Sequence, residues 1–252
     1  MLNTGTAGDM QLFLLFGQSN MEGAPKAEAT DLLENPRVRV LGYDTFGDRK
    51  WNEWAIAKPP LHRSWAGLGP GDHFGKALAE AWPDKTIGLI PCAISGVDID
   101  FFRKGVVSDR RSEFEIPPDN SRDSAYDMIL ERVQLAKQSG VVRGILFHQG
   151  ESDSGQTAWV GKVQALLANL RSDLNLGDSV PFLAGELLYT GCCSGHNALV
   201  RQLPDVIPNA HVVSAAGLGE LEDQYNAHFD LPAQRELGRR YAQVMLEALG
   251  AH

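Results

Sequence analysis

Short, almost continuous apolar segments alternate along this chain with longer segments in which apolar residues recur at helical spacing. The apolar segments predict strands at 11–16, 38–43, 86–91, 142–148 and 180–187, with a further candidate edge strand at 211–214. Their length and apolar character are typical of strands that are covered on both faces. The helical spacing predicts helices at 72–82, 124–139, 157–174 and 232–249.

This alternation is typical of the α/β class. We expect a three-layer α/β/α sandwich, in which helices cover both faces of a central parallel sheet of about five strands. The chain shows no internal repeat and no linker, so residues 1–252 are expected to form a single domain. Residues 103–123 are polar and contain two adjacent prolines, which predicts a long surface loop that acts as a lid or as a wall of a substrate site.

The charge of the chain narrows the class of partner. The formal net charge is -9, and the shares of hydrophobic residues (43%) and charged residues (22%) are ordinary for a globular protein. Nucleic-acid binding needs clustered Lys and Arg side chains, so we expect no nucleic-acid partner. A neutral or weakly charged substrate fits this composition better than a polyanion.

No apolar segment approaches the roughly 20 residues that a membrane span needs, so we expect no membrane partner. Residues 12–16 are too few for the core of a signal peptide, and no basic residue precedes them. The compartment stays open, with secretion or the periplasm expected if the chain is a trimmed mature form. The oligomeric state also stays open.

The three cysteines, Cys92, Cys192 and Cys193, do not form the pattern of a disulfide framework. We expect small buried side chains with at most one bridge between them.

Three predicted strands end in polar sequences that contribute little to stability. These are Gly17–Met21 (GQSNM), Cys92–Gly96 (CAISG) and His148–Asp153 (HQGESD). Such conflicts between local sequence and stability are expected at functional sites, and the carboxyl ends of parallel strands are where α/β proteins bind ligands. Taken singly, each motif also has a structural interpretation: Ser19 as a helix N-cap and Gly96 as a turn glycine.

Gln149 and Glu151 lie two positions apart after a buried strand, so an extended chain points both in the same direction. A buried carboxylate needs a partner, and a histidine is a natural one. Among the seven histidines, His228 lies just before the last predicted helix, where it can reach a site at the strand ends. No two histidines have the spacing of a helical zinc motif, so we expect no metal and no other cofactor.

Four segments together resemble the SGNH hydrolases, and in particular carbohydrate esterase family six and the sialate O-acetylesterase-like domain. The segments are LLFGQSNMEG, IPCAISGVDI, GILFHQGESDS and HFDLPAQRELGRRYA, and the resemblance extends from residue 11 to about residue 248. It implies a flavodoxin-like α/β/α fold, Ser19 as nucleophile and His228 as base. It also implies an oxyanion hole made by Ser19, Gly96 and Gln149. We further expect Gln18, Asn20 and Asp230 to contact substrate.

The sequence offers two candidates for the acid of the catalytic triad. Many members of the resembling family carry an Asp three residues before the histidine, but here that position is Tyr225. We expect Glu151 to orient His228, with Asp223 as the alternative acid, because triads are defined by geometry rather than by chain order. A Ser–His dyad that is assisted by a backbone carbonyl is a further alternative.

The resemblance implies an esterase that removes O-acetyl groups from saccharides through an acyl-enzyme, with acetylated xylan as the first candidate substrate and O-acetyl sialic acid as the second. A general short-chain esterase and a non-catalytic carbohydrate-binding relative are the alternatives. Dinucleotide binding through the glycines of segment 67–71 is disfavoured, because no predicted strand precedes them. The aromatic residues that could stack on a sugar ring are Trp51, Trp54, Trp65, Phe101 and Phe102.

Overall fold

Strand β1 (Met10–Gly17) lies at the centre of a sheet of seven strands in the computed structural model, which describes residues 9–106 and 124–250. The order across the sheet is β3-β2-β4-β1-β5-β6-β7, and every neighbouring pair is parallel except β2 and β3. The other strands are β2 (Val38–Leu41), β3 (Trp54–Ile56), β4 (Ile87–Pro91), β5 (Gly140–His148), β6 (Phe182–Gly185) and β7 (Ala210–Val213).

The α/β class is confirmed, and each predicted strand occurs within a few residues of its expected position, including the edge strand β7. The expected number of about five strands is too low. The sequence pattern did not predict β3, because it has only three residues, all of them half-buried, and it pairs antiparallel at the edge of the sheet.

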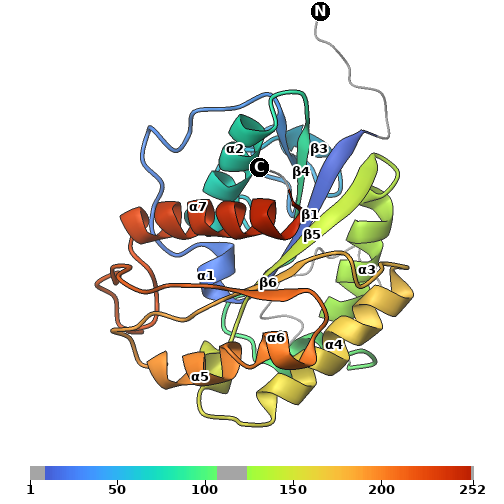
Figure 1. Ribbon diagram of the computed structural model, residues 1–252. Helices are drawn as coiled ribbons and strands as arrows, with labels where there is room; N and C mark the ends of the chain where they lie inside the picture. The colour runs from blue at the N-terminus through green and yellow to red at the C-terminus, as the bar shows by residue number, and fades with distance from the viewer. Residues whose placement is uncertain (1–8, 107–123, 251–252) are drawn as a thin grey trace, which may run out of the picture.

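Helices cover both faces of this sheet (Figure 1). The four long helices match the predicted ones, and short helices follow β1 and β6. The α-helices of the described residues are α1 (Ser19–Glu22), α2 (Pro70–Ala81), α3 (Ala125–Ala136), α4 (Trp159–Asp173), α5 (Asn197–Val200), α6 (Leu203–Val206) and α7 (Leu231–Ala248). The 3-10 helices are η1 (Ile99–Phe102), η3 (Glu151–Asp153) and η4 (Ser194–His196).

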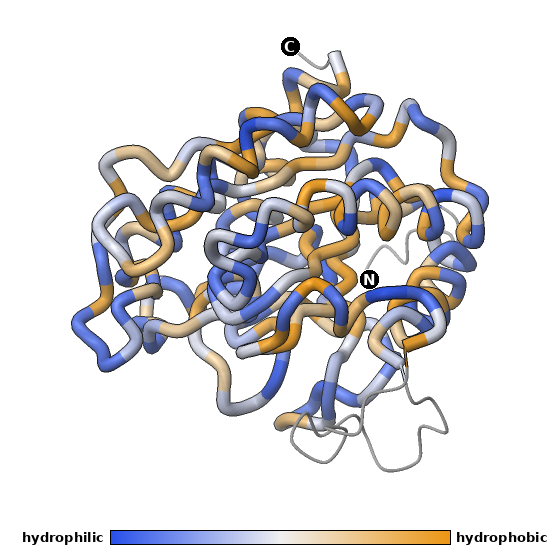
Figure 2. Tube along the Cα trace, turned by 90° about the horizontal axis from the view of Figure 1, so that it is seen from below, coloured by the Kyte–Doolittle hydropathy of each residue, from blue (hydrophilic) through white to orange (hydrophobic). Residues whose placement is uncertain are grey.

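The alternation of side chains along β1 divides the core into two layers. Leu12, Leu14 and Phe16 pack with the residues of α3 and α4, whereas Phe13 and Leu15 pack with those of α2 and α7. All five are at most 1% exposed, as expected for a central strand with helices on both sides. Figure 2 shows many hydrophobic residues in the middle of the molecule and many hydrophilic residues on the outer turns.

A fully buried arginine, Arg132, binds the carboxyl ends of two neighbouring strands. Arg132 of α3 donates hydrogen bonds to the carbonyl oxygens of Pro91, Gly42 and Leu41 and to the side chain of Asn52. These acceptors satisfy a guanidinium group that has no access to water. Arg132 thereby fixes the ends of β2 and β4. The segment 92–96 continues directly from the end of β4.

The glycines of segment 67–71 also have a structural role. The N–H of Gly67 donates to the carbonyl oxygen of Gly23 at 2.8 Å, and α2 begins at Pro70. This segment packs the start of α2 against α1.

Most of the polar segment 103–123 lies outside the described residues. None of the helices in the described ranges is long and apolar enough to cross a membrane.

Candidate active site

Ser19 occupies a sharp turn between β1 and α1 at the carboxyl edge of the sheet. Gly17 before it has φ +136°, and a Cβ there would lie 2.0 Å from the carbonyl oxygen of His148. Only glycine accommodates this conformation and this close approach. The chain can therefore turn directly from a central strand into a helix, with the half-buried Ser19 as the first helical residue.

Three side chains form a continuous line of hydrogen bonds. His228 Nε2 lies 2.9 Å from Ser19 Oγ, and His228 Nδ1 lies 2.5 Å from Asp223 Oδ2. The imidazole is 12% exposed and the Asp223 side chain is 20% exposed, so the group is sheltered but reachable. This arrangement of nucleophile, base and orienting acid is the geometry that activates a serine hydroxyl.

Asp223 is held as a carboxylate. Partial burial acts to raise its pKa, but hydrogen bonds from His228 and from the N–H groups of Tyr225 and Asn226 outweigh that effect, and the pKa is lowered. The expectation that Glu151 orients His228 is therefore corrected, because Asp223 occupies the Nδ1 side of the imidazole. The loop bends at Asn226, which has φ +49°, and so brings an acid five residues away back to the histidine.

Glu151 contacts His228 only indirectly. Its Oε1 accepts a hydrogen bond of 2.6 Å from Asn20 Nδ2, and the same nitrogen donates to the carbonyl oxygen of Ala227. Asn20 Oδ1 accepts from the N–H of Phe229 at 3.1 Å. Asn20 therefore holds the backbone on both sides of His228, and Glu151 holds Asn20. Burial raises the pKa of Glu151, and the bond from Asn20 opposes this only in part.

The side chain of Gln149 is enclosed rather than directed at Ser19. Its Oε1 accepts from Trp159 Nε1 at 2.6 Å, while its Nε2 donates to Asp153 Oδ2 at 2.5 Å and to Gln18 Oε1 at 3.2 Å. The amide N–H groups are occupied and the residue is 1% exposed. The geometry thus corrects the expectation that Gln149 stabilises an oxyanion, because no free N–H remains for that task.

Two backbone donors remain beside Ser19. No group among the described residues accepts a hydrogen bond from the N–H of Ser19 or of Gly96. The two segments run side by side, because the N–H of Ile94 donates to the carbonyl oxygen of Gly17 at 2.9 Å. Gly96 is exposed with φ +74°, and a Cβ there would meet nothing within 4 Å. These donors suit a transient negative charge on a substrate oxygen.

Glu22 fixes the segment that carries Gly96. Its Oε2 accepts from both the N–H (2.8 Å) and the hydroxyl of Ser95, and its Oε1 lies 3.5 Å from Arg63 Nε. Burial raises the pKa of this carboxyl, and Arg63 and Ser95 act in the opposite direction. The sequence analysis did not single out Glu22, although its position three residues after Ser19 places both on one face of α1.

The three residues that were expected to contact substrate belong to the framework of the site instead. Gln18 is 3% exposed and its Oε1 faces the N–H groups of Gly150 and Ser152. Asn20 is fully buried. Asp230 caps α7 through a 2.8 Å bond from the N–H of Ala233. We therefore correct these assignments, because burial or capping occupies each side chain.

Four of the five aromatic residues proposed for sugar stacking pack into the protein. Phe101 and Phe102 are buried, and Trp51 and Trp54 are half-buried against the core. Trp65 is 60% exposed, and the Arg63 guanidinium lies over its ring at 5.3 Å. Among these candidates, Trp65 alone presents its ring to solvent.

Cys192 and Cys193 form a disulfide between adjacent residues, and Cys92 is free and buried. The N–H of Cys192 donates to the carbonyl oxygen of Asn226 at 2.7 Å, and Cys193 Sγ lies 3.8 Å from the carbonyl oxygen of Glu151. The bridge therefore lies between the loop after β5 and the loop that carries Asp223 and His228. Within residues 9–106 and 124–250, no three His, Cys, Asp or Glu side chains are grouped to hold a metal ion.

Comparison with known proteins finds relatives that match almost the whole chain. A protein of Arabidopsis thaliana described as a probable carbohydrate esterase is 28% identical over 264 residues, which cover 94% of this chain and 90% of that protein. A solved structure from Arabidopsis thaliana superposes with a TM-score of 0.76 at 27% identity, covering 95% of this chain and 98% of that one.

Two more distant solved structures share the fold. The protein NanS has a TM-score of 0.73 at 17% identity, with 96% of this chain and 98% of that chain covered. A carbohydrate acetylesterase from Xanthomonas citri has a TM-score of 0.67 at 17% identity, with 96% and 57% covered. A family profile described as carbohydrate esterase, sialic acid-specific acetylesterase matches residues 9–247. The chain therefore belongs to this family of carbohydrate esterases.

Proposed function

We propose that this protein is a serine esterase that removes O-acetyl groups from saccharides through an acyl-enzyme. The observation that carries the proposal is the line of hydrogen bonds from Ser19 through His228 to Asp223. A serine hydroxyl is a weak nucleophile until a base takes its proton, and an imidazole held by a carboxylate is such a base. Membership of a carbohydrate esterase family supports the saccharide as the alcohol component.

In the proposed reaction, Ser19 Oγ attacks the acetyl carbonyl carbon and its proton passes to His228 Nε2. The N–H groups of Ser19 and Gly96 stabilise the oxyanion. His228 Nε2 then gives its proton to the sugar oxygen as the bond between that oxygen and the acyl carbon breaks. A water molecule gives a proton to His228 and attacks the acetyl-Ser19 ester, and acetate leaves as Ser19 regains its proton.

The identity of the sugar is the finer part of the proposal. The sequence resemblance places acetylated xylan first, whereas the description of the matching family favours O-acetyl sialic acid. Acetylated xylo-oligosaccharides and O-acetyl sialic acid are therefore the two substrates to compare. A clear preference for long-chain acyl esters would replace both with a lipolytic function.

The test is hydrolysis of both acetylated saccharides by the wild type and by Ser19→Ala. We expect the substitution to lower kcat on the order of 10⁶-fold, as loss of the nucleophile does in serine hydrolases. Wild-type protein that binds the saccharides without releasing acetate would instead support a carbohydrate-binding relative without catalysis. Circular dichroism of both proteins checks that the variant is folded.

A further inference from the structure

The turn that joins Asp223 to His228 is fixed from both sides. Asp223 Oδ1 accepts hydrogen bonds from the N–H groups of Tyr225 (2.8 Å) and Asn226 (3.2 Å). The carbonyl oxygen of Asn226 accepts a third from the N–H of Cys192, which is part of the disulfide. A turn held in this way presents its outward side chain in a defined place. That side chain is Tyr225.

Tyr225 is 60% exposed, yet its ring lies directly beside the imidazole of His228. The ring centroids are 5.3 Å apart and the planes make an angle of 67°. The Tyr225 hydroxyl has no hydrogen-bond partner among the described residues. An aromatic ring that stays open to water on a fixed turn is available for contact with a ligand.

The chemistry of the esterase places a particular part of the substrate beside this ring. His228 Nε2 must come within hydrogen-bond distance of the leaving oxygen to return the proton that it took from Ser19. In an O-acetylated saccharide that oxygen is bonded to a carbon of the sugar ring or of its side chain. The sugar therefore leaves from the His228 side of the site, where Tyr225 is the adjacent exposed aromatic residue.

We propose that Tyr225 forms the binding subsite for the leaving sugar, with the aromatic ring packed against the C–H face of the saccharide. This inference rests on the proposed function. It also gives position 225 a role. Many SGNH hydrolases of the branch that this chain resembles carry the triad acid at this position. Here Asp223, two residues earlier, is the acid, and Tyr225 contacts the sugar. An acetyl ester without a sugar ring makes no such contact.

The experiment compares the wild type with Tyr225→Ala and Tyr225→Phe on two kinds of ester. One is the acetylated saccharide that the wild type hydrolyses faster, and the other is ethyl acetate, whose leaving group has no ring. We expect Tyr225→Ala to lower kcat/KM about threefold to tenfold on the saccharide, mainly through KM, and to leave ethyl acetate unchanged. Tyr225→Phe keeps the ring and should retain most of the activity on the saccharide.

Val141→Ala is the matched control. Val141 is 58% exposed at the start of β5, whereas His148 at the other end of that strand borders the site. We expect no change in kcat/KM on either ester, because this truncation removes exposed apolar surface far from the chemistry.

Several outcomes would overturn the subsite. An equal loss on both esters, with a shifted pH profile, would show that Tyr225 positions His228 instead of binding sugar. Unchanged activity of Tyr225→Ala on the saccharide would remove the subsite while the proposed function stands. A wild type that hydrolyses ethyl acetate but neither saccharide would overturn the proposed function and the subsite together.

Discussion

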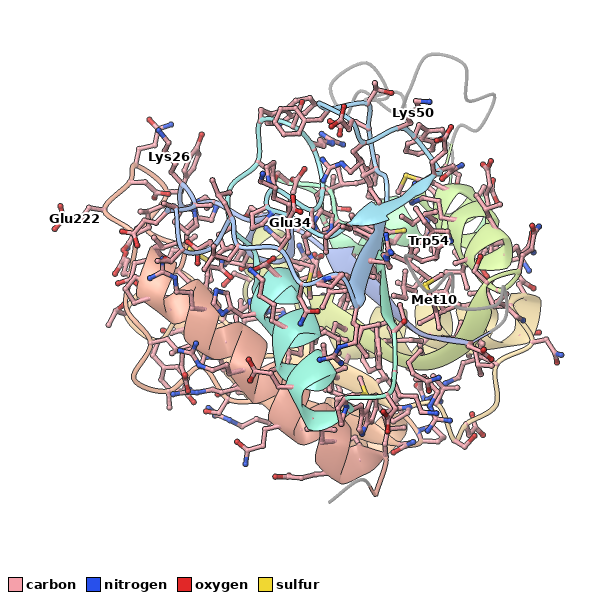
Figure 3. All side chains as sticks on the ribbon, turned by 90° about the horizontal axis from the view of Figure 1, so that it is seen from above. Met10, Lys26, Glu34, Lys50, Trp54 and Glu222 are labelled. Carbon is pink, nitrogen blue, oxygen red and sulfur yellow. A yellow bond between two sulfur atoms is a disulfide. The ribbon has the colours of Figure 1, made fainter. Side chains whose placement is uncertain are left out.

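The loop after β5 (the inner loop) and the loop before α7 (the outer loop) both bring a carboxyl group to the active site, but the two carboxyl groups differ in burial. In the inner loop, residues 152 and 154–158 are exposed, but Gln149 and Asp153 are at most 1% exposed and the Glu151 side chain is 7% exposed. In the outer loop, residues 222 and 224–226 are exposed and the Asp223 side chain is 20% exposed. Figure 3 shows Glu222 at the periphery of the molecule, on the opposite side of the view from Met10 at the start of β1.

This difference explains which carboxyl group can serve as the acid of the triad. Burial raises the pKa of Glu151 in the inner loop, whereas hydrogen bonds lower that of Asp223 in the outer loop in spite of its partial burial. The imidazolium that forms during catalysis needs an ionised partner. The buried carboxyl group of Glu151 is therefore suited to holding Asn20 in position, and the partly solvated carboxylate of Asp223 is suited to pairing with the imidazolium.

The sharpest way to test the comparison is to neutralise each carboxyl group without changing its size. We expect Asp223→Asn to lower kcat about 10⁴-fold, because the imidazole loses its ionised partner and the tautomer it requires. Glu151→Gln should lower kcat less than about tenfold, because the amide oxygen can still accept the bond from Asn20. Steady-state kinetics on the acetylated saccharide measures both.

The same pair of variants can contradict this account. A loss on Glu151→Gln as large as that on Asp223→Asn would return Glu151 to the triad. Thermal unfolding of both variants is the control, because a misfolded protein would lose activity for another reason.

A smaller loss of kcat is expected from a change at Glu22, the buried carboxyl group that fixes the segment carrying the N–H of Gly96. Glu22→Gln weakens the contacts to Arg63 and Ser95, and thereby loosens the segment that carries Gly96. We expect kcat to fall about tenfold with KM unchanged, since the N–H of Gly96 acts on the transition state and not on the bound substrate. A rise in KM alone would argue that the segment binds substrate instead.

The smallest effect concerns stability. Burial lowers the pKa of His148, the last residue of β5, to about 3 from its ordinary value of 6.5. The unfolded chain therefore binds more protons than the folded one between these values, so stability is fully present above pH 6.5 and is lost as the pH falls toward 3.

Urea unfolding at pH 7 and pH 5 measures this loss. The midpoint should be lower at pH 5, and His148→Gln should reduce the difference between the two midpoints. Part of the difference should remain in that variant, because burial also lowers the pKa of His62 to about 3 and that of His196 to about 4. The same difference between the two midpoints in the wild type and in His148→Gln would contradict the burial of the His148 ring as a neutral group.

The long elements were predictable because their periodicity is local. Four helices and six strands follow directly from the spacing of apolar residues, and the motifs at the strand ends located Ser19 and Gly96. The sequence did not predict β3 or α1. The three residues of β3 are all half-buried and form no apolar run, and the four residues of α1 are too few to show a helical period.

The sequence also identified His228 as a partner for Ser19, because the resemblance to the SGNH hydrolases implies these roles and His228 lies just before the last predicted helix. It did not determine which acid faces His228, because that depends on the bend at Asn226. The enclosure of Gln149 and the clamping of Asn20 depended in the same way on contacts between segments more than 100 positions apart. Residue types and periods are local properties that the sequence determines, whereas the free N–H groups, the ionised carboxyl group and the exposed ring of Tyr225 are decided only when the folded chain buries their neighbours.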